Sequence, residues 1–509
     1  MDMQLTTKEI CMSTDVFSTD VEQAVDGEYT LPDYCPDIKR ILRCNMTPFI
    51  HNVSMSGNTV NLDGSVSINI LYLSGDKKEV RCFEVQSSFS KKVDMPENCD
   101  DCDITCLADS EYVNCRAVNE RKLDVHGAVS IKVNCRGQKS IMAVSGANCD
   151  DVQVRTDKAE FSKQICNADK LIIVNEEIST DESNSPILNI ICKSVDIINE
   201  DVKPVMNKVV YRCDLSVKFT YLNEDGAYET VSDTVPISQI IESEGMAENA
   251  AVFCKSKICG LELKPRTDRN GNCTSAILNC KMLVGVRAWE MCRADIVTDS
   301  YSTECDMKKT ERRTSLLTIG DKTFVSQSQK AVFDISDGIG DVICIYTETP
   351  DINVTPNGQN AVISGNVPIG IVYINSEGDC CYAEKDAEIE LQKELGDEYN
   401  SFDFVCRVGD IGYTIDSDTG IEVRFDIKIN ILPMQLREIT LIEELSKDES
   451  SPKTCSDRPA MTLYFAKKGE SVWDIAMRYN TRADDIMKQN ELTADILPSP
   501  KMLIIPSMA

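Results

Sequence analysis

The chain has 509 residues, a formal net charge of −30 and a hydrophobic fraction of 42%. This length predicts three or four domains, each large enough to bury a core, and the hydrophobic fraction is typical of a folded protein. The negative charge argues against a nucleic-acid partner, which needs a basic face. No apolar run approaches 18 residues, so we expect no transmembrane segment.

The 24 cysteines bear on the cellular compartment. The chain opens MDMQLTTKEI, which has neither a basic n-region nor an apolar h-region, so no secretory signal is visible. Most cysteines lie in strand-like runs, where a free thiol behaves as a small apolar side chain. We therefore expect reduced cysteines and a cytoplasmic protein.

The first segments predict extended structure. Residues 13–30 resemble a strand pair, and the two prolines of Leu31–Ile38 (LPDYCPDI) favour an extended entry. Ile38, Ile41 and Leu42 have the i, i+3, i+4 spacing of a short helix or a tight turn. Ser185–Cys192 occupies the equivalent place further along the chain.

The segment Asn58–Asp76 alternates apolar and polar residues over its whole length, which predicts a long strand with one buried face and a hairpin turn after it. The same pattern recurs in Asn207–Gly226 and Asn360–Asp379. Three copies at a period of about 150 residues indicate three similar domains. In the third copy, Gly365 lies on the inward parity, where glycine often marks a bulge or a close backbone approach.

Each copy also contains a later alternating segment that resembles its central strand: Lys122–Cys135, Ala276–Ala288 and Ile421–Leu432. The sequence therefore predicts a mainly all-β protein of three tandem antiparallel β-domains. We place the domains at residues 1–156, 157–305 and 306–445. Residues 446–460 are polar and contain two prolines, which predicts a flexible linker.

The last segment, residues 461–509, changes to a βααβ pattern. Leu463–Phe465 and Met502–Ile505 read as short strands. Ser471 and Thr481 each precede a helical pattern and have an aspartate three residues later, so we expect both to be N-caps.

Candidate metal and catalytic residues are sparse. Cys99, Cys102 and Cys106 would need a fourth ligand such as Cys115 to form a zinc site, and ordinary loop cysteines are favoured over a metal. His51 and His126 lie near no nucleophile motif, and Gly338-Ile339-Gly340 lacks the rest of a phosphate loop. We expect no enzyme activity and no cofactor.

The C-terminal segment resembles a LysM domain through Gly469-Glu470-Ser471-Val472, Ile475-Ala476, Asn490-Glu491-Leu492 and Leu503–Pro506. The resemblance implies a groove for N-acetylglucosamine-containing glycans between two loops. Its residues here are Gly469, Glu470, Ser471 and Val472, with Asp495, Ile496 and Leu497 opposite. Glu470, Val472 and Pro500 depart from the family pattern, so we expect protein contact to outweigh glycan binding.

The LPDYCPDI motif and the alternating strand after it resemble the SPOCS domain of spore-coat proteins, and copy two lacks the proline-containing motif. Three such repeats followed by a LysM domain are similar to the SipL-type coat morphogenetic proteins of spore-forming clostridia. The resemblance implies a mother-cell adaptor that docks the coat on the forespore surface. Its implied partners are the coat's ATPase scaffold, SpoIVA, other coat proteins and, as a second candidate, glycan or peptidoglycan precursor.

Two other functions compete with this adaptor. One is a cell-wall-targeted enzyme that a LysM domain anchors to peptidoglycan, and an export signal or a catalytic dyad would favour it. The other is a self-assembling structural protein whose β-domains associate edge to edge. Its behaviour in size-exclusion chromatography would distinguish it from a monomeric adaptor.

Overall fold

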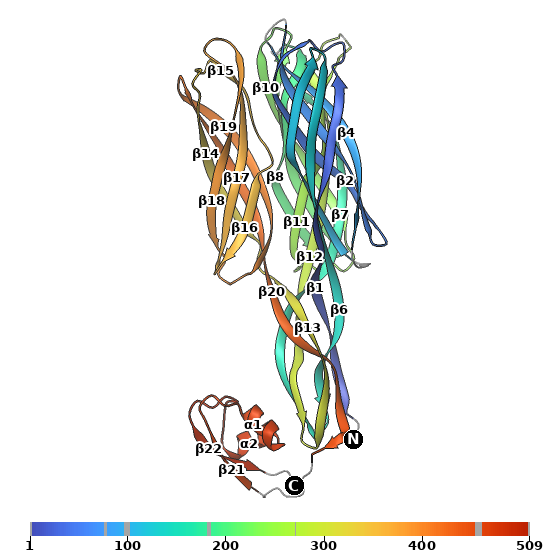
Figure 1. Ribbon diagram of the computed structural model, residues 1–509, viewed down its shortest axis with the longest axis vertical. Helices are drawn as coiled ribbons and strands as arrows, with labels where there is room; N and C mark the ends of the chain where they lie inside the picture. The colour runs from blue at the N-terminus through green and yellow to red at the C-terminus, as the bar shows by residue number, and fades with distance from the viewer. Residues whose placement is uncertain are drawn as a thin grey trace.

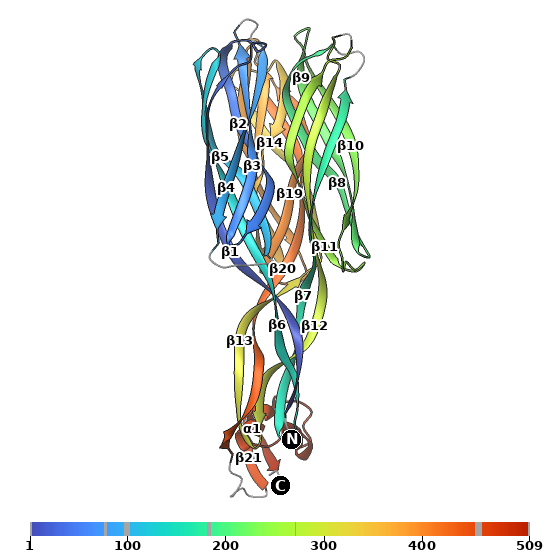
Figure 2. The same ribbon diagram turned by 90° about the vertical axis from the view of Figure 1, so that its right-hand side faces the viewer.

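The computed structural model describes residues 3–75, 79–95, 102–180, 185–269, 271–453 and 461–506, without the side chains of residues 12–16 and 138. The molecule is elongated (Figure 1). Three β-sandwich repeats lie side by side and form a head, a narrow stem of long twisted strands extends from the head, and a small C-terminal unit lies at the far end of the stem (Figures 1 and 2).

The first two repeats share one design of two three-stranded antiparallel sheets. In the first repeat the sheets have the orders β1-β6-β5 and β2-β3-β4, and in the second the orders are β11-β12-β7 and β10-β9-β8. The strands of the first are β1 (Gln4–Thr30), β2 (Ile38–Ser56), β3 (Thr59–Ser74), β4 (Val80–Asp94), β5 (Cys102–Asn119) and β6 (Lys122–Asn148). Those of the second are β7 (Val152–Ser179), β8 (Ile187–Val205), β9 (Lys208–Asn223), β10 (Tyr228–Glu242), β11 (Ala251–Arg266) and β12 (Ser275–Ser302).

The third repeat follows the same plan with two of its strands divided. Its sheets are β13-β20-β14 with β19 also paired to β20, and β15-β17-β16 with β18 also paired to β17. The strands are β13 (Cys305–Ile319), β14 (Thr323–Asp334), β15 (Asp341–Thr347), β16 (Asp351–Asn357), β17 (Asn360–Ile374), β18 (Cys380–Glu394), β19 (Ser401–Ser417) and β20 (Gly420–Pro452). The predicted all-β fold is confirmed.

The three alternating segments are the middle strands of their sheets, β3, β9 and β17. In β3, Val60, Leu62, Val66, Ile68 and Ile70 are all fully buried, as the period-two pattern predicts. The later alternating segments lie in β6, β12 and β20, the middle strands of the opposite sheets. Each sandwich core therefore forms between the two patterned strands of its repeat.

The helix expected at residues 38–42 is wrong, because β2 already begins at Ile38. Its helix-like spacing has another cause: β-bulges interrupt the pairing with β3 between Ile38 and Arg40 and between Ile41 and Arg43. Each bulge adds one residue, so side chains of one face recur at intervals of three instead of two.

An equivalent bulge occurs in every repeat, between Ile41 and Arg43, Ile190 and Cys192, and Val342 and Cys344. The extra residues are Leu42, Ile191 and Ile343, and all three pack in one cluster formed by the three repeats. A bulge re-aims a side chain. Here it supplies each repeat with an apolar contact to its neighbours.

The stem consists of the distal parts of three strand pairs, β1/β6, β7/β12 and β13/β20, which twist around each other (Figure 2). Its core combines residues of all three pairs: Ile10, Ile141, Phe161, Ile296, Leu316 and Leu441. The strand pair expected within residues 13–30 is wrong, because these residues belong to the single strand β1, whose partner is β6. A strand that runs from the stem into the head needs no turn.

The expected linker at 446–460 is wrong in its first part. Residues 446–452 continue β20, where Ser446 pairs with Lys308 and Pro452 with Cys305. Polar residues suit a strand with little surrounding core, which explains why the composition suggested a linker. The rest of the predicted linker, apart from Lys453, lies outside the described residues.

The described cysteines are reduced except for Cys102, which is disulfide-bonded. The expectation that all cysteines are reduced is therefore wrong at Cys102. Cys99 lies outside the described residues. Within the described ranges, no group of histidine, cysteine and acidic residues is arranged to hold a metal ion, and no helix has the length and apolarity to span a bilayer.

Candidate functional site

The C-terminal unit (residues 461–506) folds as strand, helix, helix, strand: β21 (Met461–Ala466), α1 (Val472–Tyr479), α2 (Ala483–Gln489) and β22 (Lys501–Pro506). Ser471 is the N-cap of α1, because its Oγ accepts hydrogen bonds from the amides of Trp473 and Asp474. The expected N-cap Thr481 is wrong. Arg482 occupies that position without a side-chain cap, and the Thr481 hydroxyl instead donates to the carbonyl of Pro506.

The two loops of the predicted groove lie side by side. Gly469 N donates to Leu497 O at 2.9 Å, Leu497 N to Glu470 O at 3.0 Å and Val472 N to Asp495 O at 2.8 Å. Ser471 and Ile496 form the bridge between these bonds. The structure thus brings together all seven residues predicted for the groove, although they come from segments about twenty residues apart.

The two acidic residues of the groove make internal contacts. The Glu470 carboxylate accepts the Lys467 amide at 2.8 Å and the Tyr464 hydroxyl, and the amide bond in particular lowers the pKa of Glu470. Asp495 accepts the Ser471 hydroxyl and the Trp473 amide, each at 2.9 Å. Both carboxylates therefore fix the shape of the loops.

The groove residues differ in what they offer to a ligand. The side chains of Val472 and Leu497 are buried in the core of the C-terminal unit, so they anchor the loops to that core and are not available to a ligand. Ile496 is 59% exposed, and Gly469 has a φ of +86° that favours glycine. The exposed surface of the groove therefore consists mainly of Gly469, Ile496 and the backbone of the two loops.

The C-terminal unit packs against the end of the stem. Tyr301 of β12 is buried in its core, where its hydroxyl donates to Thr481 O at 2.8 Å and its ring meets the Trp473 ring edge-to-face at 4.9 Å. Arg155 of β7 forms an ion pair with Asp495 at 3.6 Å. Sequence reasoning missed these contacts because about 180 residues separate Tyr301 from its partners.

The outer face of the β21–β22 sheet is apolar and exposed. Met461, Leu463 and Phe465 are 57%, 63% and 70% exposed, and Met502 is 60% exposed. Phe465 pairs with Met502 and Leu463 with Ile504, so these side chains share one face. The opposite face carries Ala466, Leu503 and Ile505, which pack on the helices.

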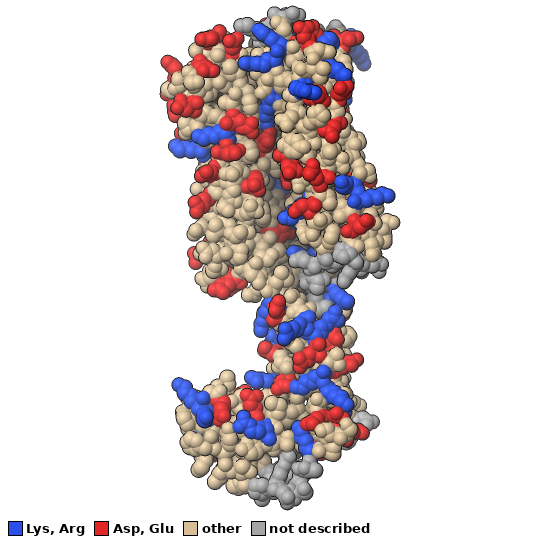
Figure 3. Space-filling model, in the orientation of Figure 1, with Lys and Arg blue, Asp and Glu red and all other residues tan. Residues whose placement is uncertain are grey.

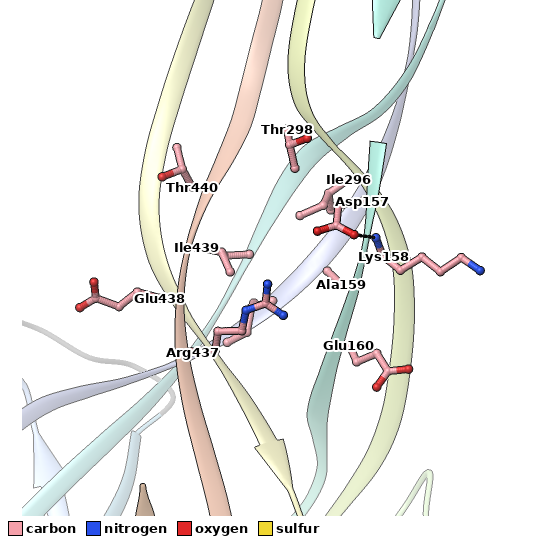
Figure 4. Close-up of a pocket in the computed structure, with 11 residues that line it drawn as sticks. Asp157, Lys158, Ala159, Glu160, Ile296, Thr298, Arg437, Glu438, Ile439 and Thr440 are labelled. Carbon is pink, nitrogen blue, oxygen red and sulfur yellow. Dashed lines mark hydrogen bonds between the residues drawn. The ribbon is translucent and has the colours of Figure 1, made fainter. Parts of the chain in front are cut away.

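A second concave site lies in the stem, where strands β7 and β12 meet β13 and β20 (Figure 4). It has a volume of about 290 Å³ and an apolar floor that includes Ile296, Leu316 and Ile439. Arg437 extends across it, and Asp157 and Lys158 lie on the far side (Figure 4). The lining combines charges of both signs with the hydroxyls of Thr298 and Thr440, and this mixture indicates no particular reaction.

The two histidines lie in the first repeat. His51 Nε2 is 2.8 Å from the Ser65 hydroxyl, a pair that sequence reasoning missed because the two residues lie on neighbouring strands. Burial lowers the pKa of His51, and the ring also forms a hydrogen bond with the backbone of Cys259, not with a carboxylate. His126 contacts Asp26 and Asp124, and the Asp26 hydrogen bond raises its pKa. Neither set forms a serine–histidine–carboxylate triad.

Comparison with protein families gives two matches. The family model described as SipL, SPOCS domain, matches residues 37–118 and 186–264, which cover β2–β5 and most of β8–β11. The LysM domain model matches residues 464–506. No curated protein and no solved structure matches the chain. The chain is therefore SipL-like, with SPOCS-domain segments in its first two repeats and a C-terminal LysM domain, as its sequence motifs predict.

Proposed function

We propose that this chain is a non-enzymatic adaptor in spore-coat assembly that docks coat proteins on the mother-cell side of the forespore surface. The SPOCS and LysM domains are binding domains associated with spore proteins, which supports this role. An elongated molecule with a large head and a LysM domain at the other end suits an adaptor, because the two ends can bind different components (Figure 1). The partners proposed are a SpoIVA-like ATPase scaffold and other coat proteins.

The exposed apolar face of the β21–β22 sheet is the observation that carries the proposal. Four large side chains, Met461, Leu463, Phe465 and Met502, present a contiguous surface that solvent disfavours. Such patches mark contact sites for protein partners. Lys467 and Lys468 follow β21 and Lys501 begins β22 beside them, so the partner surface would be apolar with acidic residues at its border.

Glycan binding is the second candidate. The aligned loops with exposed Gly469 and Ile496 favour it, because LysM grooves contact glycans through loop backbone. One contact argues against glycan binding: the Asp495 carboxylate, at one edge of the groove, is already paired with Arg155 of the stem. We therefore place protein contact first, with N-acetylglucosamine-containing glycan as the weaker ligand.

Titration of the full chain with three separate ligands tests whether protein binds more tightly than glycan. The ligands are a SpoIVA-like scaffold, chitotetraose and peptidoglycan fragments. Phe465→Lys should weaken scaffold binding at least tenfold, because a buried interfacial aromatic contributes about 2 kcal/mol or more. The matched variant Ile496→Lys, in the groove, should leave the affinity for the scaffold unchanged. Tight saccharide binding that Ile496→Lys removes, without any response to the scaffold, would contradict the proposal.

A further inference from the structure

The loop between β1 and β2 presents one aromatic side chain to solvent. Tyr34 is 86% exposed, more than any other large apolar or aromatic residue in the described part of the chain. It lies in a turn closed by a 2.9 Å hydrogen bond from Cys35 N to Pro32 O. The loop is at the end of the head opposite the stem (Figures 1 and 2). The binding proposed for the LysM domain does not involve this loop.

The loop is held rigidly by Arg121, from the turn between β5 and β6. Its guanidinium donates to the carbonyls of Leu31, Pro32 and Cys35 at 3.3, 2.8 and 3.2 Å. It also pairs with the Asp37 carboxylate at 2.6 Å. A planar guanidinium with several fixed acceptors orders a loop at low entropic cost.

Apolar anchors fix both ends of the same loop. Leu31 and Ile38 are 2% and 5% exposed. The buried Tyr72 donates its hydroxyl to Pro36 O at 3.2 Å, and Gly75 N donates to Asp37 O at 2.9 Å. The loop is therefore a rigid part of the head, and the exposure of Tyr34 is imposed by its backbone instead of resulting from local disorder.

We propose that Tyr34 is the anchor of a second protein-docking surface, at the tip of the head. Tyrosine provides a large amphipathic contact with few rotatable bonds, and an anchor on a preorganised loop loses little entropy on binding. Interface energy concentrates in such residues. The partner would offer a pocket for the ring.

Charge determines the kind of partner. Loops of all three repeats place acidic side chains at the same end of the head, including Asp33, Glu120, Asp225, Asp268, Asp337 and Glu377. Basic side chains lie among the acidic ones at this end (Figure 3), but within the described residues of these loops only Arg121 and Arg269 are basic, so negative charge predominates. The LysM residues 461–506 contain six basic and six acidic side chains, so the net charge of −30 resides in the rest of the chain. Phosphate-rich partners are repelled by such a surface. A protein with a basic rim around an apolar pocket fits it.

This surface is separate from the apolar face of β21–β22, because the two lie at opposite ends of the molecule (Figure 1). The inference rests on the proposed adaptor function and deepens it by locating a partner site on the head, and it depends on no LysM contact. With both surfaces in use, one chain would connect two different proteins along its length.

Site-specific photo-crosslinking tests the proposal. p-Benzoylphenylalanine replaces Tyr34 in the full chain, expressed in sporulating cells, and the adducts are identified by mass spectrometry. The control carries the same group at Tyr112, which is 51% exposed on β5 of the same repeat. We expect one dominant adduct, with a protein that has a basic surface, at position 34 only. Phe465→Lys should leave this adduct intact, which separates the result from a failure of the LysM proposal.

Binding of the purified adduct protein to the full chain provides the second measurement. Tyr34→Ala should weaken the affinity at least tenfold and Tyr112→Ala should not, with the thermal melting temperatures of both variants unchanged. Raising the salt concentration should weaken the wild-type complex. The proposal is overturned by adducts no more specific than those at Tyr112, by an acidic adduct protein, or by unchanged affinity in Tyr34→Ala.

Discussion

The indole Nε1–H of Trp473 donates to the Asp299 carboxylate at 2.8 Å, so the first helix of the LysM domain is bonded to the end of the stem. Asp299 also pairs with Lys309 of β13. Two strand pairs of the stem therefore hold this carboxylate in position for the LysM domain. The contact argues against a LysM domain that moves independently of the repeats.

Tyr301→Ala tests whether the stem completes the LysM core. Removal of a tyrosine that is 3% exposed leaves a cavity, and we expect the LysM domain to lose about 3 kcal/mol of stability. Limited proteolysis should then cleave within residues 461–506 before it cleaves the head. The control Tyr413→Ala, at a position that is 45% exposed, should retain the wild-type pattern. Equal protection of residues 461–506 in both variants would show that the LysM core is self-sufficient.

Gly365→Val should unfold the third repeat. Gly365 has a φ of +152°, and a Cβ there would collide with the carbonyl oxygen of Asp351 on β16. We expect a loss of more than about 3 kcal/mol, since strain and a backbone clash combine. Denaturant unfolding measures it.

Gly412→Ala is the matched control in the same repeat, because a Cβ at that position meets no atom within 4 Å. The LysM domain should remain folded in Gly365→Val, since Arg155, Asp299 and Tyr301, which contact it directly, belong to β7 and β12 of the second repeat. The third repeat supports this contact only indirectly, through the ion pair of Lys309 with Asp299. Absence of a protease-resistant C-terminal fragment would refute this independence from the third repeat.

Asp196→Asn should stabilise the protein above pH 6. Burial raises the pKa of Asp196 to about 6, and Asp410 adds to the effect, whereas Arg407 and Lys218 oppose it. An unfolded aspartate ionises near pH 4, so between pH 4 and 6 the folded state binds more protons and its stability falls as pH rises. The variant removes this penalty.

We expect a gain of up to about 2 kcal/mol in the free energy of unfolding at pH 7.5 and none at pH 4, where both side chains are neutral. Urea unfolding across this pH range measures the difference. A stability difference that stays constant with pH would exclude titration of Asp196 as its cause.

Thiol alkylation tests the state of the cysteines. Cys280 and Cys213 are 0% and 3% exposed, so both should react only after denaturation, without a reductant. Cys102 should react only after reduction, because it is disulfide-bonded. Mass spectrometry of the alkylated peptides distinguishes the two classes. Alkylation of Cys102 without reductant would contradict its disulfide.

The sequence alone determined the strands and the repeat. Alternation of apolar and polar residues is a local property of an extended chain, so β3, β9 and β17 could be located without knowledge of their partners. The close backbone approach at Gly365 and the βααβ order of the LysM domain were predicted on similar local grounds. The N-cap at Ser471 was also correct, because a cap bonds to residues two and three positions later.

Tertiary structure alone decided how the elements meet. Nothing local distinguishes a bulge from a helical turn at Ile38–Leu42, because the spacing of three arises from pairing with β3. The Arg121 contacts to the Tyr34 loop and the Trp473–Asp299 bond join residues about 90 and 174 positions apart. Such contacts depend on which strand edges and domain faces pack together, and side-chain patterns along one segment carry no record of that choice.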